Sequence, residues 1–459
     1  MNKMKQHERV AVVGMGQTGL SAVRHLKRLQ VSCECFDEAN VSLPEDMQDL
    51  VLHTGELNAE LLGGFDRVIV SPGINWRHPA LVAIRSCGIE VHGDLEEFLR
   101  HYTGSLLAVT GTNGKTTTTQ MIALMLETLP GGCEAGGNIG IPMLDLLEHE
   151  QPARVALELS SFQLERATGL RPHWAALLNV QPDHADMHES PEAYRAAKIR
   201  VFANMIMGDT AMLPKEKIWD ELAGSLHSRG VAVGRFGVMN AVEDTNADVK
   251  AGILCHEADE ALDGMLFWTQ DGERQTIACH DLRVRGYHQQ QNIAVAAQAA
   301  ADYGVSRAVI EEALMSFQGL EHRLEFVGHV AGRDWFNDSK ATNPDAAQAA
   351  LTSFDKVVWI CGGLRKGLSL DALTDVVKEH VTFACVVGKD TGAYAELLKN
   401  AGVPHVISGN IEQAVKDAKR KGKVPVLLSP AAASQDQFNN YAERGHAFVK
   451  AIRGLVDDG

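Results

Sequence analysis

The chain has 459 residues, of which 45% are hydrophobic and 22% charged, and its formal net charge is −16. This length is typical of about three domains. The negative charge argues against partners bound through a basic surface, so we expect neither nucleic acid nor a membrane as a partner. No apolar run reaches the roughly 18 residues that a membrane-spanning helix requires.

The eight cysteines are scattered and include no C-x-x-C pair, which favours thiols in a reducing compartment. The N-terminal apolar stretch, residues 10–13, is too short for a signal peptide. We therefore expect a cytoplasmic protein that works as a monomer.

A glycine motif, Gly14-Met-Gly16-Gln-Thr-Gly19, follows the first predicted strand and begins a helix. A second strand, residues 31–36, ends at Asp37, eighteen residues beyond Gly19. This spacing is typical of a Rossmann-like unit that holds a nucleotide pyrophosphate. The motif leaves the nucleotide open, with NAD as the commonest. A later strand leads into Ser71-Pro72-Gly73-Ile74, where such sheets bind ligands.

A second glycine motif lies at 105–119, where a buried strand is followed by Gly111-Thr-Asn-Gly114 and then by Lys115-Thr116 at the start of a helix. Backbone N–H groups and a helix N-terminus bind phosphate. Lys115 can reach the outer phosphates, and the Thr116 hydroxyl can hold Mg²⁺. The motif is a shortened phosphate loop, because Val109 stands where the first glycine is usual. The alternative is an ordinary turn rich in glycine and threonine.

Polar residues follow two further predicted strands. The strand 154–159 carries Glu158 near its end, where an acid that holds Mg²⁺ is expected beside a phosphate loop. A tight turn at 136–142 is expected to precede another helix. The strand 174–180 leads into residues 181–188, whose two histidines and two aspartates indicate either metal or acid–base chemistry or a polar loop. The next helix carries Lys198, which on its own is interpreted as a surface lysine.

Residues 205–285 are less regular and predict a small sheet layer that covers the domain. Asn292 begins a predicted alanine-rich helix, 293–302, where it could cap the helix or contact a base, and capping is the simpler interpretation. Strands at 334–336, 357–361 and 426–428 each end in a polar loop, so one edge of a third sheet is expected to bind ligands. The predicted domains are 1–103, 104–319 and 320–459, with the first boundary in the polar segment 93–104.

Several strings of residues together resemble the Mur ligases, in order and along the whole chain. They are Gly111-Thr-Asn-Gly-Lys-Thr116, Glu158-Leu-Ser-Ser-Phe-Gln-Leu-Glu165, Asn179-Val-Gln-Pro-Asp-His184, Tyr194-Arg-Ala-Ala-Lys198, Asn337-Asp-Ser-Lys-Ala-Thr-Asn343 and Ser429-Pro-Ala-Ala-Ala-Ser434. The second string and the first glycine motif favour the member that adds D-glutamate. Folylpolyglutamate synthases share the middle and last domains but lack the first.

The resemblance implies an α/β protein with a Rossmann-like first domain, a central ATP-binding domain with an added small sheet, and a Rossmann-like last domain. It implies an ATP-dependent ligase that joins D-glutamate to UDP-N-acetylmuramoyl-L-alanine through an acyl phosphate and a tetrahedral intermediate. Such an enzyme would serve peptidoglycan precursor synthesis, and through it cell shape and cell division. Because two anions must approach each other, Lys115 and two Mg²⁺ ions would neutralise charge.

The resemblance also implies roles for individual residues. Catalysis would involve Lys115, His184, Lys198 and Lys340, and the metal ligands would be Thr116 and Glu158 for one Mg²⁺ and His184 and a carbamylated Lys198 for the other. ATP would be bound by Gly111, Thr112, Asn113, Gly114, Lys115, Thr116, Thr117, Asn292, Arg323 and Asp338. D-glutamate would be bound by Thr342, Lys366, Ser434 and Tyr441, together with Lys340. The UDP-sugar would be bound by Gln17, Thr18, Asp37, Gly73 and Asn138, which moves the expected ligand of the first domain from NAD to UDP.

The chain departs from the family pattern at Gln289, where asparagine is common, at Tyr441, where phenylalanine is expected, and at Ala39, where a basic residue sometimes occurs. Two other hypotheses stay open. One is an NAD-linked oxidoreductase with an accessory ATP domain, and the other is a catalytically silent nucleotide sensor. The joint presence of Lys115, Glu158, His184 and Lys198 argues against the second.

Overall fold

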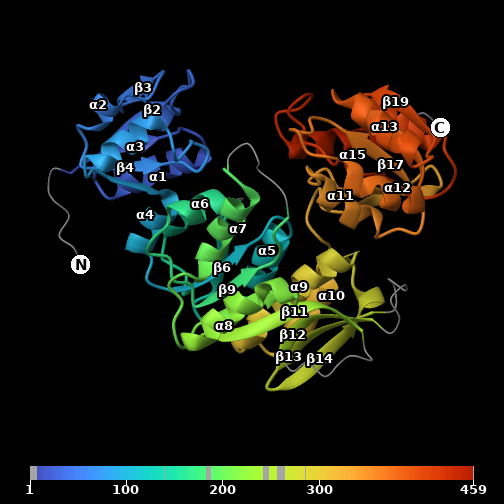
Figure 1. Cartoon of the computed structure of the whole chain (residues 1–459), viewed down its shortest axis with the longest axis horizontal. Helices are drawn as coiled ribbons and strands as arrows, with labels where there is room; N and C mark the ends of the chain where they lie inside the picture. Colours follow the sequence, from blue (N-terminus) through green and yellow to red (C-terminus); the bar gives the residue numbers. More distant parts are fainter. Residues whose placement is uncertain are drawn as a thin grey trace.

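The computed structural model describes residues 8–138, 140–181, 188–240, 248–255, 264–284 and 286–457. It consists of three α/β lobes, each built around one sheet (Figure 1). The lobes follow one another along the chain, blue, then cyan through green to yellow, then orange to red in Figure 1. The predicted fold class, α/β with three domains, is confirmed, whereas the predicted domain boundaries stay a prediction.

The first lobe is a five-stranded parallel sheet in the order β3-β2-β1-β4-β5. Alternate residues of β1 face opposite sides, so Val10 and Val12 join one apolar core while Ala11 and Val13 join another. The elements are β1 (Arg9–Val13), α1 (Gln17–Arg28), β2 (Ser32–Asp37), β3 (Leu52–Thr54), α2 (Ala59–Leu62), β4 (Arg67–Val70), α3 (Pro79–Ser86), β5 (Glu90–Gly93) and α4 (Asp94–His101).

The second lobe is a nine-stranded sheet in the order β14-β13-β12-β11-β10-β9-β6-β8-β7, with β12, β13 and β14 paired antiparallel. Strands from 205–285 therefore continue the central sheet and do not form the separate layer expected from the sequence. The strands are β6 (Ser105–Thr110), β7 (Cys133–Gly137), β8 (Arg154–Glu158), β9 (Trp174–Leu177), β10 (Thr210–Pro214), β11 (Ala232–Asn240), β12 (Val249–Cys255), β13 (Met265–Gln270) and β14 (Glu273–Ala278). The helices are α5 (Lys115–Leu126), α6 (Ser161–Arg166), α7 (Pro191–Ile199), α8 (Asp220–Ser228), α9 (Tyr287–Asp302) and α10 (Arg307–Ser316).

Two sequence expectations about helices in this lobe are wrong. Helix α9 begins at Tyr287 after Gly286, so Asn292 lies inside the helix and does not cap it. The turn at 136–142 leads only into a short 3₁₀ turn, Asp145–Leu147, in place of a full helix.

The third lobe is a six-stranded sheet in the order β15-β16-β20-β17-β18-β19. Since β16, β20 and β17 are parallel neighbours, the three polar loops that follow them emerge at one edge, as predicted. The strands are β15 (Glu325–Val330), β16 (Arg333–Asn337), β17 (Val357–Gly362), β18 (Val381–Val387), β19 (His405–Gly409) and β20 (Val426–Leu428). The helices are α11 (Pro344–Leu351), α12 (Thr374–His380), α13 (Thr391–Asn400), α14 (Ile411–Lys419) and α15 (Tyr441–Asp457).

The polar segment at the first predicted boundary is helix α4, and it belongs to the core. Its Leu95 and Phe98 join one apolar cluster that contains residues of both the first and second sheets. The carboxylate of Glu97 is fully buried and accepts a hydrogen bond from Arg67. His92 Nε2 lies within hydrogen-bond distance of the same carboxylate, at 2.9 Å. Burial alone would raise the pKa of Glu97, but His101, His92 and the charge of Arg67 outweigh burial and lower it. Burial also lowers the pKa of the nearby His25 to about 4.

Arg166, at the end of α6, binds the first lobe through its guanidinium. Its two terminal nitrogens donate to the carbonyls of Ser71 at 2.6 Å and Pro72 at 3.0 Å, and also to those of Val70 and Ile74. The side chain is buried, so one charged group donates to four carbonyl groups at the end of β4 and in the loop that follows it.

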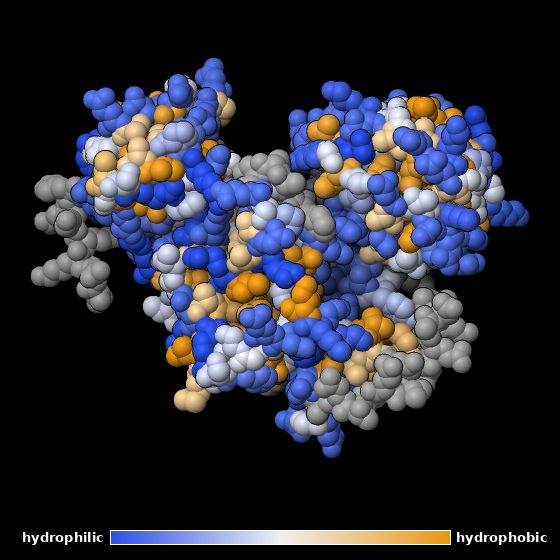
Figure 2. Space-filling model, in the orientation of Figure 1, coloured by the Kyte–Doolittle hydropathy of each residue, from blue (hydrophilic) through white to orange (hydrophobic). Residues whose placement is uncertain are grey.

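No helix in the described part of the chain combines the length and apolar character needed to cross a bilayer. The face shown in Figure 2 is mostly hydrophilic, with hydrophobic residues in small groups among polar ones.

Replacing Arg166 with Met should lower the free energy of unfolding by about 2–4 kcal/mol, because the carbonyl groups of Val70, Ser71, Pro72 and Ile74 lose the charged donor that Arg166 provides. Urea denaturation followed by circular dichroism measures this loss. Arg307→Met is the matched control, since Arg307 lies on the surface of α10 and pairs with Glu311 at i+4. It should cost about 0.5 kcal/mol or less. Equal effects of the two substitutions would contradict the assigned role of Arg166.

Candidate functional site

The loop between β6 and α5 leads into a helix N-terminus that no side chain among the described residues caps. Gly111 and Gly114 have φ of +156° and +87°, a conformation that favours glycine. A Cβ on Gly114 would also lie 2.4 Å from the Asn292 side chain. Gly114 is the N-cap of α5, and no side chain among the described residues caps this helix. The first N–H groups of α5 and the positive end of its dipole are therefore available to an anion.

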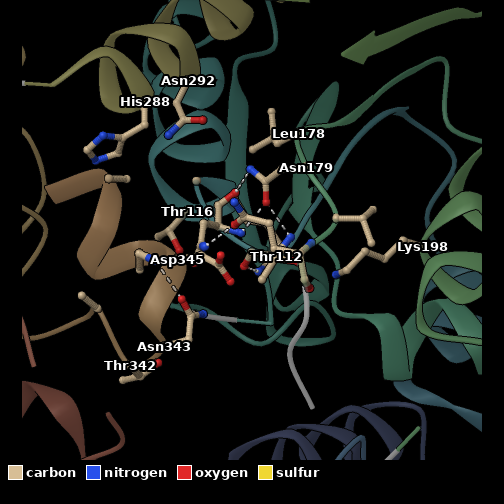
Figure 3. Close-up of a pocket in the computed structure, with 18 of the residues that line it drawn as sticks. Thr112, Thr116, Leu178, Asn179, Lys198, His288, Asn292, Thr342, Asn343 and Asp345 are labelled. Carbon is tan, nitrogen blue, oxygen red and sulfur yellow. Dashed lines mark hydrogen bonds between the residues drawn. The ribbon is translucent and has the colours of Figure 1, made fainter. Parts of the chain in front are cut away.

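Asn179, just after β9, fixes the shape of this loop. Its Oδ1 accepts from the backbone N–H groups of Thr112 at 3.0 Å and Asn113 at 2.8 Å, and its Nδ2 donates to the Asn113 carbonyl at 3.0 Å. Figure 3 shows Asn179 directed toward the loop beside Thr112. The sequence reasoning did not single out this residue as a site residue, although a polar residue after a predicted strand was a signal for it.

Two lysines meet at one backbone oxygen of the loop. Lys115 Nζ donates to the Gly111 carbonyl at 3.0 Å and to the Thr112 carbonyl at 2.8 Å, and Lys198 Nζ donates to the same Gly111 oxygen at 2.8 Å. Lys198 is only 1% exposed, and its Nζ lies 4.5 Å from the centre of the Tyr194 ring. The interpretation of Lys198 as a surface lysine is therefore wrong.

Glu158 and Thr116 form a compact oxygen pair next to the loop. The Thr116 hydroxyl donates to Glu158 Oε2 at 2.6 Å, and Asn138 Nδ2 donates to Oε1 at 3.1 Å. Arg323, from the third lobe, donates to the Thr116 hydroxyl oxygen at 2.6 Å.

The carboxylate of Glu158 is ionised in this environment. Burial alone would raise its pKa, but the charge of Lys115, the Thr116 hydroxyl and the charge of Arg323 outweigh burial and lower the pKa. A buried anion flanked by a hydroxyl oxygen is a suitable pair of ligands for a hard cation.

These groups line a cavity of about 680 Å³ between the second and third lobes. Figure 3 shows His288 and Asn292 entering it from α9, and Asn343 and Asp345 from the third lobe, opposite the phosphate loop. Of the predicted residues, the cavity is lined by Thr112, Asn113, Gly114, Lys115, Thr116, Asn138, Glu158, Lys198, Asn292, Arg323, Asp338, Lys340, Thr342 and Lys366. The geometry thus brings most of the predicted ATP, metal and acceptor residues to one space.

Other predicted residues lie beside the cavity. Thr117 is buried against α9, where its hydroxyl donates to Gln289 Oε1 at 3.3 Å. Tyr441 contacts Lys340, whose Nζ lies 3.9 Å from the ring centre. Ser434 is 1% exposed, and its hydroxyl has no hydrogen-bond partner among the described residues.

Asp338 is buried and already hydrogen-bonded. Its Oδ1 accepts from the Leu324 N–H at 3.1 Å and its Oδ2 from the Ser429 hydroxyl at 2.8 Å. Burial raises its pKa to about 7, against the effects of these bonds and of nearby arginines.

A second cavity, of about 320 Å³, lies beside the first glycine motif. It is lined by all five residues predicted for the UDP-sugar: Gln17, Thr18, Asp37, Gly73 and Asn138. The Asp37 carboxylate accepts from the Met15 N–H at 2.7 Å and the Ala39 N–H at 2.9 Å, which shapes the loop. Asn138 lines both cavities and so marks their border.

The loop expected to carry acid–base or metal chemistry lies only in part among the described residues. Asp183, His184 and Asp186 lie outside the described residues. His188 is buried, with Nε2 at 2.9 Å from the Ser161 hydroxyl and its ring stacked on Phe162, so it has a packing role.

Profiles of three domain families match the chain in order. The Mur ligase MurD-like N-terminal domain matches residues 8–93, the Mur ligase middle domain 109–300, and the Mur ligase glutamate ligase domain 322–431. A relative named UDP-N-acetylmuramoylalanine–D-glutamate ligase from Caulobacter vibrioides (strain NA1000 / CB15N) is 36% identical, covering 98% of this chain and 96% of its own. A relative with the same name from Pelotomaculum thermopropionicum is 35% identical, with 98% of each chain covered.

Solved structures agree in fold. A UDP-N-acetylmuramate–alanine ligase from Thermotoga maritima is 20% identical with a TM-score of 0.60, covering 98% of this chain and 100% of its own. A MurF ligase from the same organism, solved with ADP, is 16% identical with a TM-score of 0.61, covering 99% and 96%. On the full-length sequence matches and the three domain profiles, the chain belongs to the Mur ligase family.

Proposed function

We propose that the protein is an ATP-dependent ligase that adds D-glutamate to UDP-N-acetylmuramoyl-L-alanine, as a cytoplasmic monomer in peptidoglycan precursor synthesis. The names of its full-length relatives support this substrate pair. The structural observation that carries the proposal is the pair of cavities that share Asn138. One has the features of a nucleotide-triphosphate site, and the other adjoins a dinucleotide-type glycine loop.

The reaction requires activation of a carboxylate, because a carboxylate does not react with an amine at neutral pH. The uncapped N–H groups of α5 and the Lys115 ammonium would bind the transferring phosphate, and Arg323 would approach it from the third lobe. These fixed positive groups stabilise the charge that develops as the acyl phosphate forms. The substrate carboxylate would enter past Asn138 from the second cavity.

The oxygen ligands present suit Mg²⁺. Thr116 and Glu158 would hold one ion, since hydroxyl and carboxylate oxygens are its usual protein ligands, and the contact of the Arg323 guanidinium with the Thr116 hydroxyl supports a cation at this position. The bound ion would neutralise negative charge on the triphosphate. The remaining steps depend on the positions of the protein's own donors.

D-glutamate carries two carboxylates, so its site needs cations. Lys340, Lys366 and Arg365 line the third-lobe side of the large cavity, and Thr342 adds a hydroxyl. In this position the amine of D-glutamate would face the acyl phosphate formed at the α5 end. Attack gives a tetrahedral intermediate, from which inorganic phosphate leaves and the amide remains.

Lys198 would act as a carbamate. The Lys198 ammonium first loses one proton, and the neutral amine then adds CO₂ with loss of a second proton, so that a cation becomes an anion. The shared Gly111 oxygen supports this step, because two ammonium groups on one carbonyl repel each other and a carbamate would remove that repulsion. The carbamate, with His184, would then provide oxygen and nitrogen ligands for the second Mg²⁺.

The first test measures phosphate release from ATP by the purified chain. Release should require both UDP-N-acetylmuramoyl-L-alanine and D-glutamate, and L-glutamate should not replace the D-isomer. Lys115→Ala should slow release roughly 100- to 1,000-fold, because it removes a fixed donor at the transferring phosphate. Release that proceeds without D-glutamate would refute the proposed activity.

The control for that variant is Lys450→Ala, which removes an exposed lysine on α15 that does not line the cavity. It should leave the rate unchanged. Circular dichroism should show both variants folded.

Asn179→Ala should raise the KM for ATP at least about tenfold, because the phosphate loop loses three hydrogen bonds and with them its fixed shape. Initial rates at varied ATP measure the change. Asn204→Ala is the matched control, since Asn204 also donates to two backbone carbonyls, those of Thr168 and Leu170, but does not line the cavity. A normal KM in Asn179→Ala would show that the loop keeps its shape without this amide.

Carbamylation of Lys198 predicts a ¹³C NMR carbamate signal when the protein is incubated with ¹³C-bicarbonate. The signal should disappear in Lys198→Arg and persist in Lys115→Ala, because a guanidinium does not form the carbamate. Activity should fall in CO₂-depleted buffer and return with bicarbonate. A protein that is fully active and shows no carbamate signal would contradict this role.

A further inference from the structure

Three metal-ligating side chains meet on the first lobe, at the junction of two helices. His25 lies on α1, whereas Glu97 and His101 lie four residues apart on α4 and so share one face of that helix. None of the three lines either of the cavities described above. The active-site chemistry does not account for this cluster.

The distances between the ligand atoms approach those around a single ion. His25 Nε2 and His101 Nε2 lie 4.0 Å and 3.6 Å from Glu97 Oε1. All three atoms are within 4.8 Å of one another. Zn²⁺ binds imidazole nitrogen and carboxylate oxygen at about 2.0–2.2 Å, so its tetrahedral ligands sit only slightly closer together than these atoms.

Two of the three ligand atoms are buried and make no hydrogen bond within the described residues. Their contacts with each other and with His101 are ion pairs at 3.6–4.0 Å. His25 is 3% exposed and Glu97 is fully buried. Within the described residues, neither His25 Nε2 nor Glu97 Oε1 has a hydrogen-bond partner. Buried polar atoms without partners are costly, and a bound cation would satisfy both.

The opposite oxygen of Glu97 is held in place by other groups. Arg67 donates to Oε2, and His92 Nε2 lies 2.9 Å from it. Such outer partners fix a carboxylate for metal binding while leaving its other oxygen free. Glu8 lies 3.0 Å from Arg67 Nε and offsets the positive charge that Arg67 would place near an ion.

We propose that His25, Glu97 and His101 bind a transition-metal ion, with Zn²⁺ as the best match. Two nitrogens and one carboxylate oxygen favour zinc over magnesium, which prefers oxygen ligands alone. The His101 side chain is 24% exposed, so an ion can enter from solvent and keep water as its fourth ligand.

The bound ion would connect α1 to α4. Helix α1 begins at the glycine loop beside the second cavity, and α4 leads directly into β6 of the second lobe. The ion would thus strengthen the attachment of the first lobe and act as a structural site.

The test uses the full-length chain after chelator treatment, in excess Mg²⁺ to fill oxygen-ligand sites. Titration with Co²⁺ should give the visible absorption of a tetrahedral site at one equivalent, which Zn²⁺ displaces. Zn²⁺ should also raise the Tm. His25→Gln and His101→Gln should each weaken Zn²⁺ binding by more than about 100-fold. This is more than the affinity usually lost when a residue that only contacts a metal ligand is replaced.

His53→Gln is the control, because His53 lies in the same lobe and pairs with Glu34 outside the cluster. It should bind Zn²⁺ like the wild type. His101→Gln alters a partly exposed residue at a helix end. Metal binding by this variant therefore tests the proposed site even if His25→Gln does not fold. An unchanged Co²⁺ spectrum in His101→Gln, thiolate charge-transfer bands, or no absorption in the wild type would overturn the proposal.

Discussion

The Gly111 carbonyl oxygen is the point on which the candidate site depends, because it receives both Lys115 and Lys198. Two cations at one neutral oxygen are tolerated only if negative charge lies nearby. Glu158 supplies part of that charge, and phosphate groups of a nucleotide would supply more. The same constraint explains why a chain with a strongly negative net charge concentrates positive groups at this loop.

The lobes are attached to one another in different ways. The first and second share an apolar core through α4 and are joined by the buried Arg166, so they form a well-connected pair. At the phosphate loop the third lobe makes a polar contact, from Arg323 to Thr116. Polar contacts rearrange at lower cost than apolar cores, so the third lobe is the part suited to move when ligands bind.

The sequence predicted those features that depend on neighbouring residues. The loop 111–116 was recognisable because strand, glycines, Lys-Thr and helix follow one another directly. The first glycine motif likewise predicted a nucleotide-binding lobe, but its spacing does not distinguish NAD from UDP. Family membership, which rests on the whole chain, replaces the NAD-linked oxidoreductase hypothesis.

Features that depend on pairing between distant segments were missed. Asn179 reaches the phosphate loop only because β9 lies beside β6, a pairing that no local pattern reveals. Lys198 is buried because its Nζ reaches the carbonyl of Gly111, 87 residues away in the chain, whereas its helix alone suggests a surface position. The polar glutamines at 289–291 interrupt the apolar pattern that indicates a helix. The sequence therefore predicted a helix start at Asn292, whereas α9 begins at Tyr287.

Asn138 belongs to both cavities, and this has a consequence for inhibitor chemistry. A single compound that occupies the nucleotide loop of the first lobe and the phosphate loop of the second has to pass beside this amide. Its linker should therefore be narrow and carry a hydrogen-bond acceptor or donor at that point. Selectivity over ordinary ATP-site inhibitors would come from that passage, since proteins with an isolated phosphate loop have no such connection.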